Sequence, residues 1–347
     1  MAFEQLKYSK AQIDRAGNAL RKYMLSELNN EELDFNEALN IIFNWRAAHS
    51  YVVNTFNATL REKIKRIDPK ALIAQRIKRF PSIVQKMQRR PTMRLSSMQD
   101  IGGLRAVMTS LKKIYLLEKD YENTKFKHQK LKPDDYIKNP KPSGYRCLHL
   151  LYRYESNIAP KYNGLNIEIQ LRTKLMHAWA TAIETVDTFL QYSLKASEGP
   201  QEWLDYFKQS SNALTFVEGT QCIPGFESQT KDEAFRSTLA MHKKLHVDNY
   251  LENYSLAVNH LTKEQNGSYY ILILDPEIKE LEYLSYGMDR LKEANEKYAE
   301  LEKRYSATGS RQVVLVSASS LDSLKKAYPN YFLDTHEYLK AINGLKN

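Results

Sequence analysis

The sequence predicts a protein of mixed α and β structure, divided into two domains. Its 347 residues exceed the length of one average domain and fall short of three. Helical and strand-like hydrophobic patterns alternate along the chain. The Gly-, Pro- and Ser-bearing stretch 222–228 indicates a linker, because the pattern restarts beyond it. We therefore expect a first domain over residues 1–220 and a smaller α/β domain over residues 221–347.

The first domain is predicted to open with helices and to continue with strands. Apolar residues recur at helical spacing over 35–67, and Asp68-Pro69 follows them. Ile167, Ile169 and Leu171 alternate with polar residues, which predicts a strand with one buried face. In chain order, the patterns predict helices over 9–28 and 35–67, a helical stretch over 70–89, strands over 103–109, 146–154 and 164–172, and a helix over 174–195.

The second domain shows a shorter alternation of the same kind. YYILIL and VVLVS are apolar runs of strand length, and a strongly charged helical pattern lies between them. This alternation favours a small α/β unit. The patterns predict a helix over 232–263, strands over 269–274 and 280–286, a helix over 288–304, a strand over 313–317, and short helices over 319–327 and 334–343.

Composition narrows the class of protein. Hydrophobic residues make up 42% of the chain, which is enough to build packed cores and excludes wholesale disorder. A net charge of +10 favours anionic partners such as nucleotides, nucleic acid or an acidic membrane face, although it also fits a merely basic surface. Two cysteines form no metal or disulfide framework. No apolar run is long enough to span a bilayer and no signal core opens the chain, so we expect no membrane association and a cytoplasmic protein.

Three polar segments carry candidate chemistry. Phosphoryl-type transfer from ATP needs cations on the triphosphate, carboxylates for magnesium, and a group that orients or deprotonates the attacking hydroxyl. The first segment supplies the cations and a hydroxyl before a helical stretch: Arg76, Lys78, Lys86 and Ser82. An arginine can also stack on adenine. Read alone, this segment fits a solvated basic helix better than a binding site.

The second segment is QDIGGLRAVM. Asp100 stands at the mouth of a predicted strand, where a carboxylate is well placed to hold Mg²⁺. Arg105 lies opposite the apolar face of that strand. A turn with a surface acid is the alternative interpretation.

The third segment runs from residue 134 to residue 149 and continues into a strand and a helix. Pro and Gly shape a loop that carries Lys138, Lys141 and Tyr145. On the strand, Glu168 projects from the polar face beside Gln170 and Arg172. On the helix, His177 and Glu184 are seven residues apart and share a face. A lone helical His is usually structural, but this combination also fits an active site.

Together the segments resemble the synthetase domain of RelA/SpoT homologues. The resemblance rests on four ordered motifs within about residues 40–215, which are RxK…S…K, QDIGGLR, DYIxxPKPSGYRCLH and IEIQLRTxxMHAWA. It implies a mixed sheet flanked by helices, related to the polymerase-β nucleotidyltransferases. It also implies transfer of the β,γ-pyrophosphate of ATP to a 3′-hydroxyl, with Mg²⁺ as cofactor.

The resemblance assigns a role to each site residue. Arg76 and Arg105 would hold adenine, and Lys78, Ser82 and Lys86 would hold the phosphates. Asp100 and Glu168 would bind Mg²⁺, and Glu168 would also act as the base. The acceptor would contact Tyr145, His149, Gln170, Arg172, Lys138 and Lys141, with His177 and Glu184 as support. Ser143 and Cys147 depart from the family pattern and leave the acceptor open.

The C-terminal part resembles the antitoxin half of CapRel-type fused toxin–antitoxins. The carrying residues are VVLVSASSLDSLKKAYPNYF, with Tyr328 and Tyr331 as a pair. The resemblance implies that the synthetase half modifies the 3′ end of tRNA. It also implies that the C-terminal half blocks the ATP site until a phage structural protein, such as the major capsid protein, relieves the block. The tyrosines could equally anchor a turn.

Three functions stay open on the sequence. The first is a tRNA-modifying toxin held off by its own C-terminal domain, and we expect a monomer. The second is an alarmone synthetase acting on GDP or GTP, and the third is a non-catalytic sensor of nucleotide or RNA. Candidate phosphate contacts to tRNA are Lys125, Lys127, Lys130, Lys132, Lys138, Lys141, Arg89, Arg90 and Arg94.

Overall fold

One sheet runs through the molecule. The computed structural model describes residues 3–24, 35–190, 194, 197–252, 257–260, 268–275, 278, 280–306, 311–317, 324–325 and 335–346. Over these residues the sheet has ten strands in the order β3-β5-β6-β2-β1-β10-β8-β9-β7, with β4 paired to β5. The strands are β1 (Leu72–Ile77), β2 (Gly102–Met108), β3 (Gln129–Lys130), β4 (Asp134–Asp135), β5 (Leu148–Arg153), β6 (Asn166–Thr173), β7 (Ala257–His260), β8 (Tyr269–Asp275), β9 (Glu280–Tyr286) and β10 (Gln312–Ser317). β2 pairs with β6 and β7 pairs with β9 in parallel, and the other pairs are antiparallel, which confirms the predicted mixed sheet.

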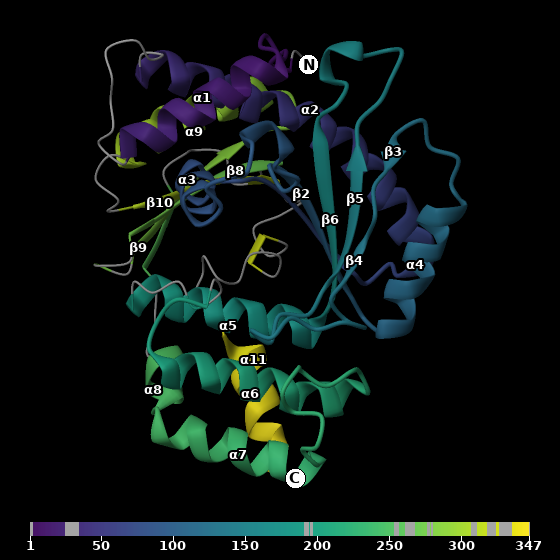
Figure 1. Cartoon of the computed structure of the whole chain (residues 1–347), viewed down its shortest axis with the longest axis vertical. Coiled ribbons are helices and arrows are strands. Elements are labelled where there is room, and N and C mark those ends of the chain that lie inside the picture. Colours follow the sequence, from purple (N-terminus) through teal and green to yellow (C-terminus); the bar gives the residue numbers. More distant parts are fainter. Residues whose placement is uncertain are drawn as a thin grey trace.

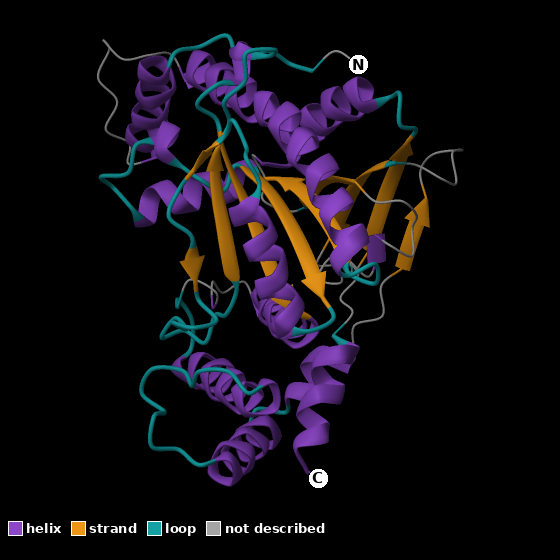
Figure 2. Cartoon of the chain, turned by 90° about the vertical axis from the view of Figure 1, so that its right-hand side faces the viewer, coloured by secondary structure: helices purple, strands orange, loops and turns teal. Residues whose placement is uncertain are grey.

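Helices cover the sheet from two sides (Figures 1 and 2). Those above it in Figure 1 are α1 (Lys10–Met24), α2 (Phe35–Ile67) and α9 (Leu291–Ser306). Those below it are α5 (Lys174–Leu190), α6 (Gln201–Glu218), α7 (Lys231–Lys244), α8 (Val247–Glu252) and α11 (His336–Asn343). Helix α3 (Phe80–Arg89) follows β1, and α4 (Leu111–Asn123) follows β2. Short 3₁₀ turns occupy Leu95–Ser97, Pro160–Tyr162 and Gly344–Lys346.

Helix α2 organises the upper layer. Its predicted apolar stripe is confirmed, because Ile42, Trp45 and Phe56 are buried in the core between α2 and the strands. The helix crosses β2 closely at Gly102. A Cβ atom there would lie 2.7 Å from Val53 Cγ2, so a glycine is needed for this approach.

The strands beyond residue 220 extend the sheet of the first predicted domain. β10 pairs antiparallel with β1, with Gln75 opposite Ser317 and Arg76 opposite Val316. Likewise α7 packs on α6, across the predicted boundary. The predicted C-terminal α/β elements are therefore present but share the sheet of the synthetase part. A division at residue 220 stays a proposal about function.

Two predicted elements are wrong, and two helices were not predicted. The stretch 70–89 is strand β1 followed by α3, because β1 lies between two hydrogen-bonded neighbours that its short sequence does not reveal. The helix predicted over 232–263 ends at Lys244, where His246 takes a left-handed φ of 49°, and continues as α8 and β7. The unpredicted helices are α4 and α6. Most of the short helix predicted over 319–327 lies outside the described residues.

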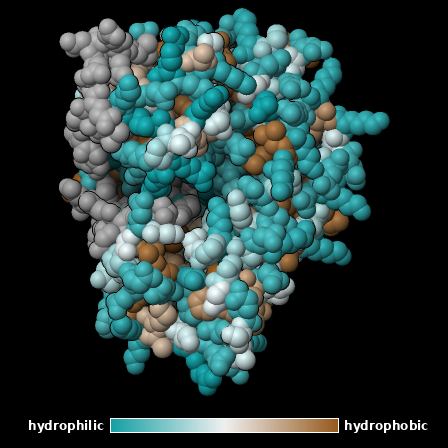
Figure 3. All heavy atoms as spheres, in the orientation of Figure 1, coloured by the Kyte–Doolittle hydropathy of each residue, from teal (hydrophilic) through white to brown (hydrophobic). Residues whose placement is uncertain are grey.

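None of the helices in the described parts of the chain is long and apolar enough to cross a membrane. Hydrophilic residues dominate the face seen in Figure 3, with small apolar areas between them.

Candidate active site

Three neighbouring strands bring the predicted catalytic residues onto one face of the sheet. Glu168 on β6 is in register with Gly103 on β2, and Gln170 is in register with Arg105. On the other side of β2, Gly103 is opposite Arg76 of β1. Because side chains alternate along a strand, Glu168, Gln170, Arg105 and Arg76 share a face. Arg76 and Arg105 are diagonal neighbours on antiparallel strands.

This face carries a hollow of about 300 Å³ that opens to solvent. Five of the predicted site residues line it together with backbone and small side chains of the three strands. The lining residues are Ala74, Gln75, Arg76, Asp100, Gly103, Leu104, Arg105, Glu168 and Gln170. The sequence motifs therefore converge on one concave site.

Two lysines that we predict to bind the ATP phosphates pair with Asp100 of the hollow. Lys78 Nζ lies 2.9 Å from Asp100 Oδ2, and Lys86 Nζ lies 2.9 Å from Asp100 Oδ1. Burial alone would raise the pKa of the Asp100 carboxyl, but the two lysines outweigh burial and hold it well below its usual range. Burial lowers the pKa of Lys78. Ser82 lies in the first turn of α3, on the same helix as Lys86.

The two carboxylates of this hollow are suitable ligands for a magnesium ion. Asp100 and Glu168 line the same space, and hard oxygen ligands are those that Mg²⁺ prefers. Among the described residues, no group of three or more His, Cys, Asp or Glu side chains forms a complete metal cage. Mg²⁺ is usually held by one or two carboxylates plus phosphate and water, so two carboxylates suffice here.

The predicted acceptor side is a continuous hydrogen-bonded network on β5, β6 and the loop before β5. His149 Nδ1 lies 2.5 Å from Glu168 Oε1, and His149 Nε2 lies 2.8 Å from the Tyr145 hydroxyl. Arg172 donates to the Tyr145 hydroxyl at 2.9 Å and to Gln170 Oε1 at 3.0 Å. Gln170 in turn donates to Glu168 Oε2 at 3.1 Å. All five residues were predicted from the sequence, and the network holds the Glu168 carboxylate in one orientation.

Charge in this network is set by its neighbours. Burial lowers the pKa of His149, but Cys147, Tyr145 and Glu168 outweigh burial and raise it. Burial raises the pKa of Glu168, but His149 outweighs burial and lowers it. At neutral pH, His149 is therefore protonated and Glu168 ionised, which makes Glu168 a good metal ligand and a weak base.

An aromatic residue that the sequence analysis missed stands beside this network. The ring of Tyr136 lies 6.0 Å from that of Tyr145 and 5.3 Å from that of His149, measured between centroids. Lys141 Nζ lies 4.2 Å from the Tyr136 ring centroid. Tyr136 could have been found as the aromatic residue within the polar segment DDYIKNPKPSGY. Lys138, by contrast, pairs with Asp135 at 3.1 Å, outside the network around Glu168.

The two predicted supporting residues lie on α5. His177 is buried there. Burial lowers the pKa of Arg172, but Tyr145, Cys147 and Glu184 outweigh burial and raise it. Glu184 thus contributes to the charge of the acceptor side. Tyr328 and Tyr331 lie outside the described residues.

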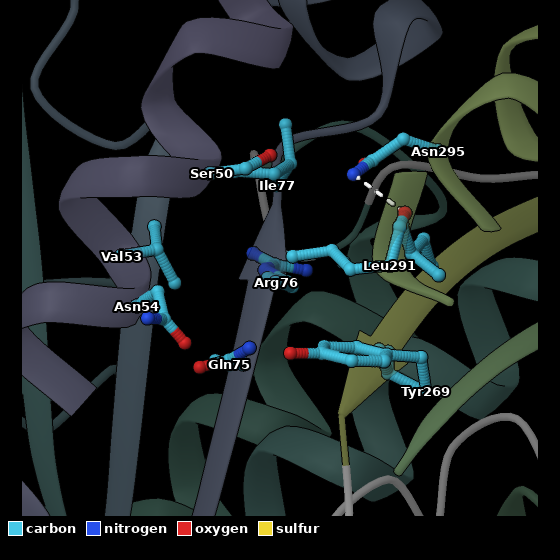
Figure 4. Close-up of a pocket in the computed structure, with 11 residues that line it drawn as sticks. Ser50, Val53, Asn54, Gln75, Arg76, Ile77, Tyr269, Leu291 and Asn295 are labelled. Carbon is cyan, nitrogen blue, oxygen red and sulfur yellow. Dashed lines mark hydrogen bonds between the residues drawn. The ribbon is translucent and has the colours of Figure 1, made fainter. Parts of the chain in front are cut away.

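A second hollow, of about 370 Å³, lies on the other face of β1 (Figure 4). Val53 and Asn54 of α2 lie on one side of it, and Tyr269 and Leu291 of the C-terminal part lie on the other. The carboxylates that phosphoryl transfer needs line the first hollow, so we assign the active site there.

Comparisons with known proteins show the family of this chain. Residues 75–193 match the family model described as the region found in RelA / SpoT proteins. The GTP pyrophosphokinase YwaC of Bacillus subtilis is 30% identical over 151 residues, which are 41% of this chain and 68% of YwaC. The chain belongs to the RelA/SpoT family of pyrophosphokinases.

Longer relatives of the RelA/SpoT family match over a small part of their length. The GTP pyrophosphokinase of Haemophilus influenzae is 31% identical over 125 residues, which are 36% of this chain and 15% of that protein.

A solved structure of a shorter protein is also similar. Small alarmone synthetase 1 of Bacillus subtilis has a crystal structure with a TM-score of 0.42 at 22% identity, covering 50% of this chain and 89% of that one.

Proposed function

We propose that this protein transfers the β,γ-pyrophosphate of ATP to the 3′-hydroxyl at the end of tRNA, under restraint by its own C-terminal part. The observation that carries the transfer is the shared hollow, in which Asp100 and Glu168 stand between the donor lysines and the Tyr145–His149–Arg172 network. Two anionic substrates can meet in one site only if cations and metal offset their repulsion.

On the donor side, the two lysines exchange the Asp100 carboxylate for the phosphates of ATP. Lys78 and Lys86 leave Asp100 and bind the triphosphate, and Ser82 adds a hydroxyl. Arg76 and Arg105 hold the adenine between them. Asp100 and Glu168 would hold Mg²⁺, which would neutralise phosphate charge.

On the acceptor side, the network orients the attacking hydroxyl. Tyr145 stacks on the acceptor base, and Glu168 receives the proton of the hydroxyl. The lowered pKa of Glu168 makes it a weak base. This is acceptable because phosphoryl transfer depends mainly on positioning and charge stabilisation.

Exposed cations favour tRNA as the acceptor. Lys125, Lys127 and Lys132 are exposed next to β3 and β4, and Arg90 and Arg94 are exposed after α3. Backbone phosphates of RNA are bound by such side chains without regard to sequence. GDP or GTP is the second candidate, because the matched relatives are named GTP pyrophosphokinases.

The path of the chain supports a C-terminal restraint. β10 ends at Ser317 opposite Gln75, beside Arg76 of the hollow, and the next long described stretch begins at Thr335 and contains α11. Ser317, which precedes the sequence that contains Tyr328 and Tyr331, therefore lies at the edge of the proposed donor site. Tethering gives an effective concentration of about millimolar, so even a weak contact there restrains the enzyme. A phage structural protein, such as the major capsid protein, is the proposed release signal.

The test uses ATP labelled on its γ-phosphate and the full chain with and without Tyr331→Ala. Truncation at residue 220 is avoided, because it would remove β10 from β1. Total tRNA, GDP and GTP are offered in separate reactions. We expect label on tRNA, lost when the 3′ end is removed, and more of it with Tyr331→Ala.

Each part of the proposal can fail separately. Label on guanosine nucleotides instead of tRNA would show that GDP or GTP is the acceptor, and would contradict tRNA as the substrate. Equal transfer by parent and Tyr331→Ala would contradict the restraint. No transfer to any acceptor by either chain would contradict the enzymatic proposal.

A further inference from the structure

A buried ion pair joins the C-terminal part to the N-terminal helices. Arg46 on α2 and Glu302 on α9 are each 3% exposed. Arg46 Nη1 donates to Glu302 Oε2 at 2.6 Å, and Arg46 Nη2 donates to Glu302 Oε1 at 3.2 Å. Such a two-pronged pair fixes geometry as well as charge. A buried pair of this kind is costly to desolvate, so its presence points to a role beyond stability.

The same two side chains hold the donor segment of the active site. Arg46 Nε donates to the backbone carbonyl oxygen of Lys78 at 3.0 Å. The backbone N–H of Phe80 donates to Glu302 Oε1 at 2.8 Å. The two contacts lie two residues apart in the turn that connects β1 to α3. Lys78 and Lys86, the phosphate lysines, flank this turn.

Glu302 of α9 also caps the N-terminus of helix α3, because its carboxylate accepts from the backbone N–H of Phe80. The N-cap residue Arg79 carries a guanidinium, which has no acceptor for the helix N–H groups, and Pro81 lacks an N–H. A carboxylate at this end also meets the positive end of the helix dipole. The position of α3, and with it Ser82 and Lys86, therefore depends on a residue of α9.

Two further contacts secure the junction. Tyr298, one turn before Glu302 on α9, donates to Glu302 Oε1 at 2.9 Å and accepts from Arg46 Nη2 at 2.8 Å. Arg79 Nη1 donates to Gln312 Oε1 of β10 at 2.7 Å. Hydrogen bonds from α9 and β10 thus hold the turn between β1 and α3 in place.

We propose that Glu302 is a positioning residue for the ATP phosphates, which makes the C-terminal part a component of the donor site. The inference rests on the donor-site assignment of the proposed function. Glu302 acts through Arg46 and the backbone of residues 78–80, which set where Lys78, Ser82 and Lys86 meet the triphosphate.

The test compares two ligands that differ in their phosphates. α,β-Methylene-ATP with Mg²⁺ uses both the adenine and the phosphate contacts, whereas adenosine uses only the contacts on β1 and β2. Dissociation constants are measured on the full chain carrying Tyr331→Ala, so that the proposed restraint does not obscure binding. Glu302→Gln should weaken binding of α,β-methylene-ATP about tenfold and leave adenosine binding unchanged.

A matched control lies two residues earlier on the same helix. Glu300 is exposed and pairs with Lys297 at 2.9 Å on the helix surface, so Glu300→Gln should change neither constant. A merely structural role of Glu302 would weaken both ligands together or change neither. Either of these results with Glu302→Gln would overturn the proposal.

A milder variant covers a failure of Glu302→Gln to fold. Tyr298→Phe keeps the ring in place and removes one donor to Glu302, so it should weaken α,β-methylene-ATP about two- to threefold, again sparing adenosine. An unchanged ratio of the two constants in this variant would overturn the proposal. Both constants are equilibrium quantities, so a failure of pyrophosphate transfer in the labelling assay would not alter them.

Discussion

Single buried histidines in this protein take opposite charge states according to their neighbours. His149 faces the Glu168 carboxylate and is held protonated. His49, in the core of α2, donates from Nδ1 to the backbone carbonyl oxygen of Trp45 at 2.8 Å. Burial lowers the pKa of His49 to about 4. The first histidine serves the site, and the second makes folding sensitive to pH.

His49 predicts a loss of stability on acidification. An unfolded histidine titrates near pH 6.5, so protons bind the unfolded chain first as pH falls from 6.5 to about 4. The stability that neutral His49 contributes is full above pH 6.5 and is lost over this window. Relative to His49→Gln, the parent should lose about 3 kcal/mol of unfolding free energy between pH 7 and pH 4. Urea unfolding at several pH values measures this difference, and a constant difference would contradict the assignment.

At the scale of elements, helix α6 fixes the acceptor loop between β4 and β5. Ser211 Oγ donates to the Gly144 carbonyl oxygen at 2.6 Å, and Arg146 donates to Glu218 at 2.6 Å. Gly144 has a φ of +90°, and a Cβ atom there would lie 3.0 Å from Ser211 Cβ and 3.2 Å from Trp179. The loop that carries Lys141 and Tyr145 is therefore shaped by a glycine against α6.

Gly144→Ala should weaken binding of the acceptor substrate and leave binding of ATP unchanged. The added methyl group strains the left-handed backbone at residue 144 and crowds Ser211 of α6. The KM for the acceptor should therefore rise about tenfold, with an unchanged KM for ATP. Gly219→Ala is the matched control, because Gly219 has a φ of +62° with nothing within 4 Å of its Cβ position. Steady-state kinetics of the two variants separate the effects. Equal acceptor KM values in both variants would show that loop shape does not govern the acceptor site.

Sequence patterns predicted helices and strands correctly where an element is long enough to show its period and buries its apolar side chains in a hydrophobic core. The stretch 35–67 is helix α2, and the runs at 269–274, 280–286 and 313–317 are β8, β9 and β10. They failed at 70–89, where a six-residue strand and a ten-residue helix carry too few residues for either period to stand out. The motifs predicted the site residues Glu168, Gln170 and Arg172 because alternation alone puts side chains on one face of β6, whereas Tyr136 belongs to a loop without a period.

At the scale of the whole molecule, the sheet joins parts that are far apart in the sequence. Arg46 and Glu302 are 256 residues apart, and β1 and β10 pair through only two registered residue pairs. No local pattern encodes which exposed strand edge meets which, so this junction could not be predicted from one sequence. Removing the C-terminal part would take Glu302 and Tyr298 away from Arg46 and β10 away from β1. The C-terminal part is therefore integral to the fold as well as a candidate regulator.

The most direct test of the central claim is pyrophosphate transfer by Glu168→Gln. Glutamine keeps the shape of the side chain and its place opposite Gly103 but lacks the negative charge that we propose to hold Mg²⁺ and to receive the proton. We measure transfer of label from γ-labelled ATP by the parent and the variant in the full chain carrying Tyr331→Ala, with circular dichroism as a check on folding. We expect the folded variant to lose transfer by at least about 10³-fold. A folded variant that transfers label at the rate of the parent would contradict it.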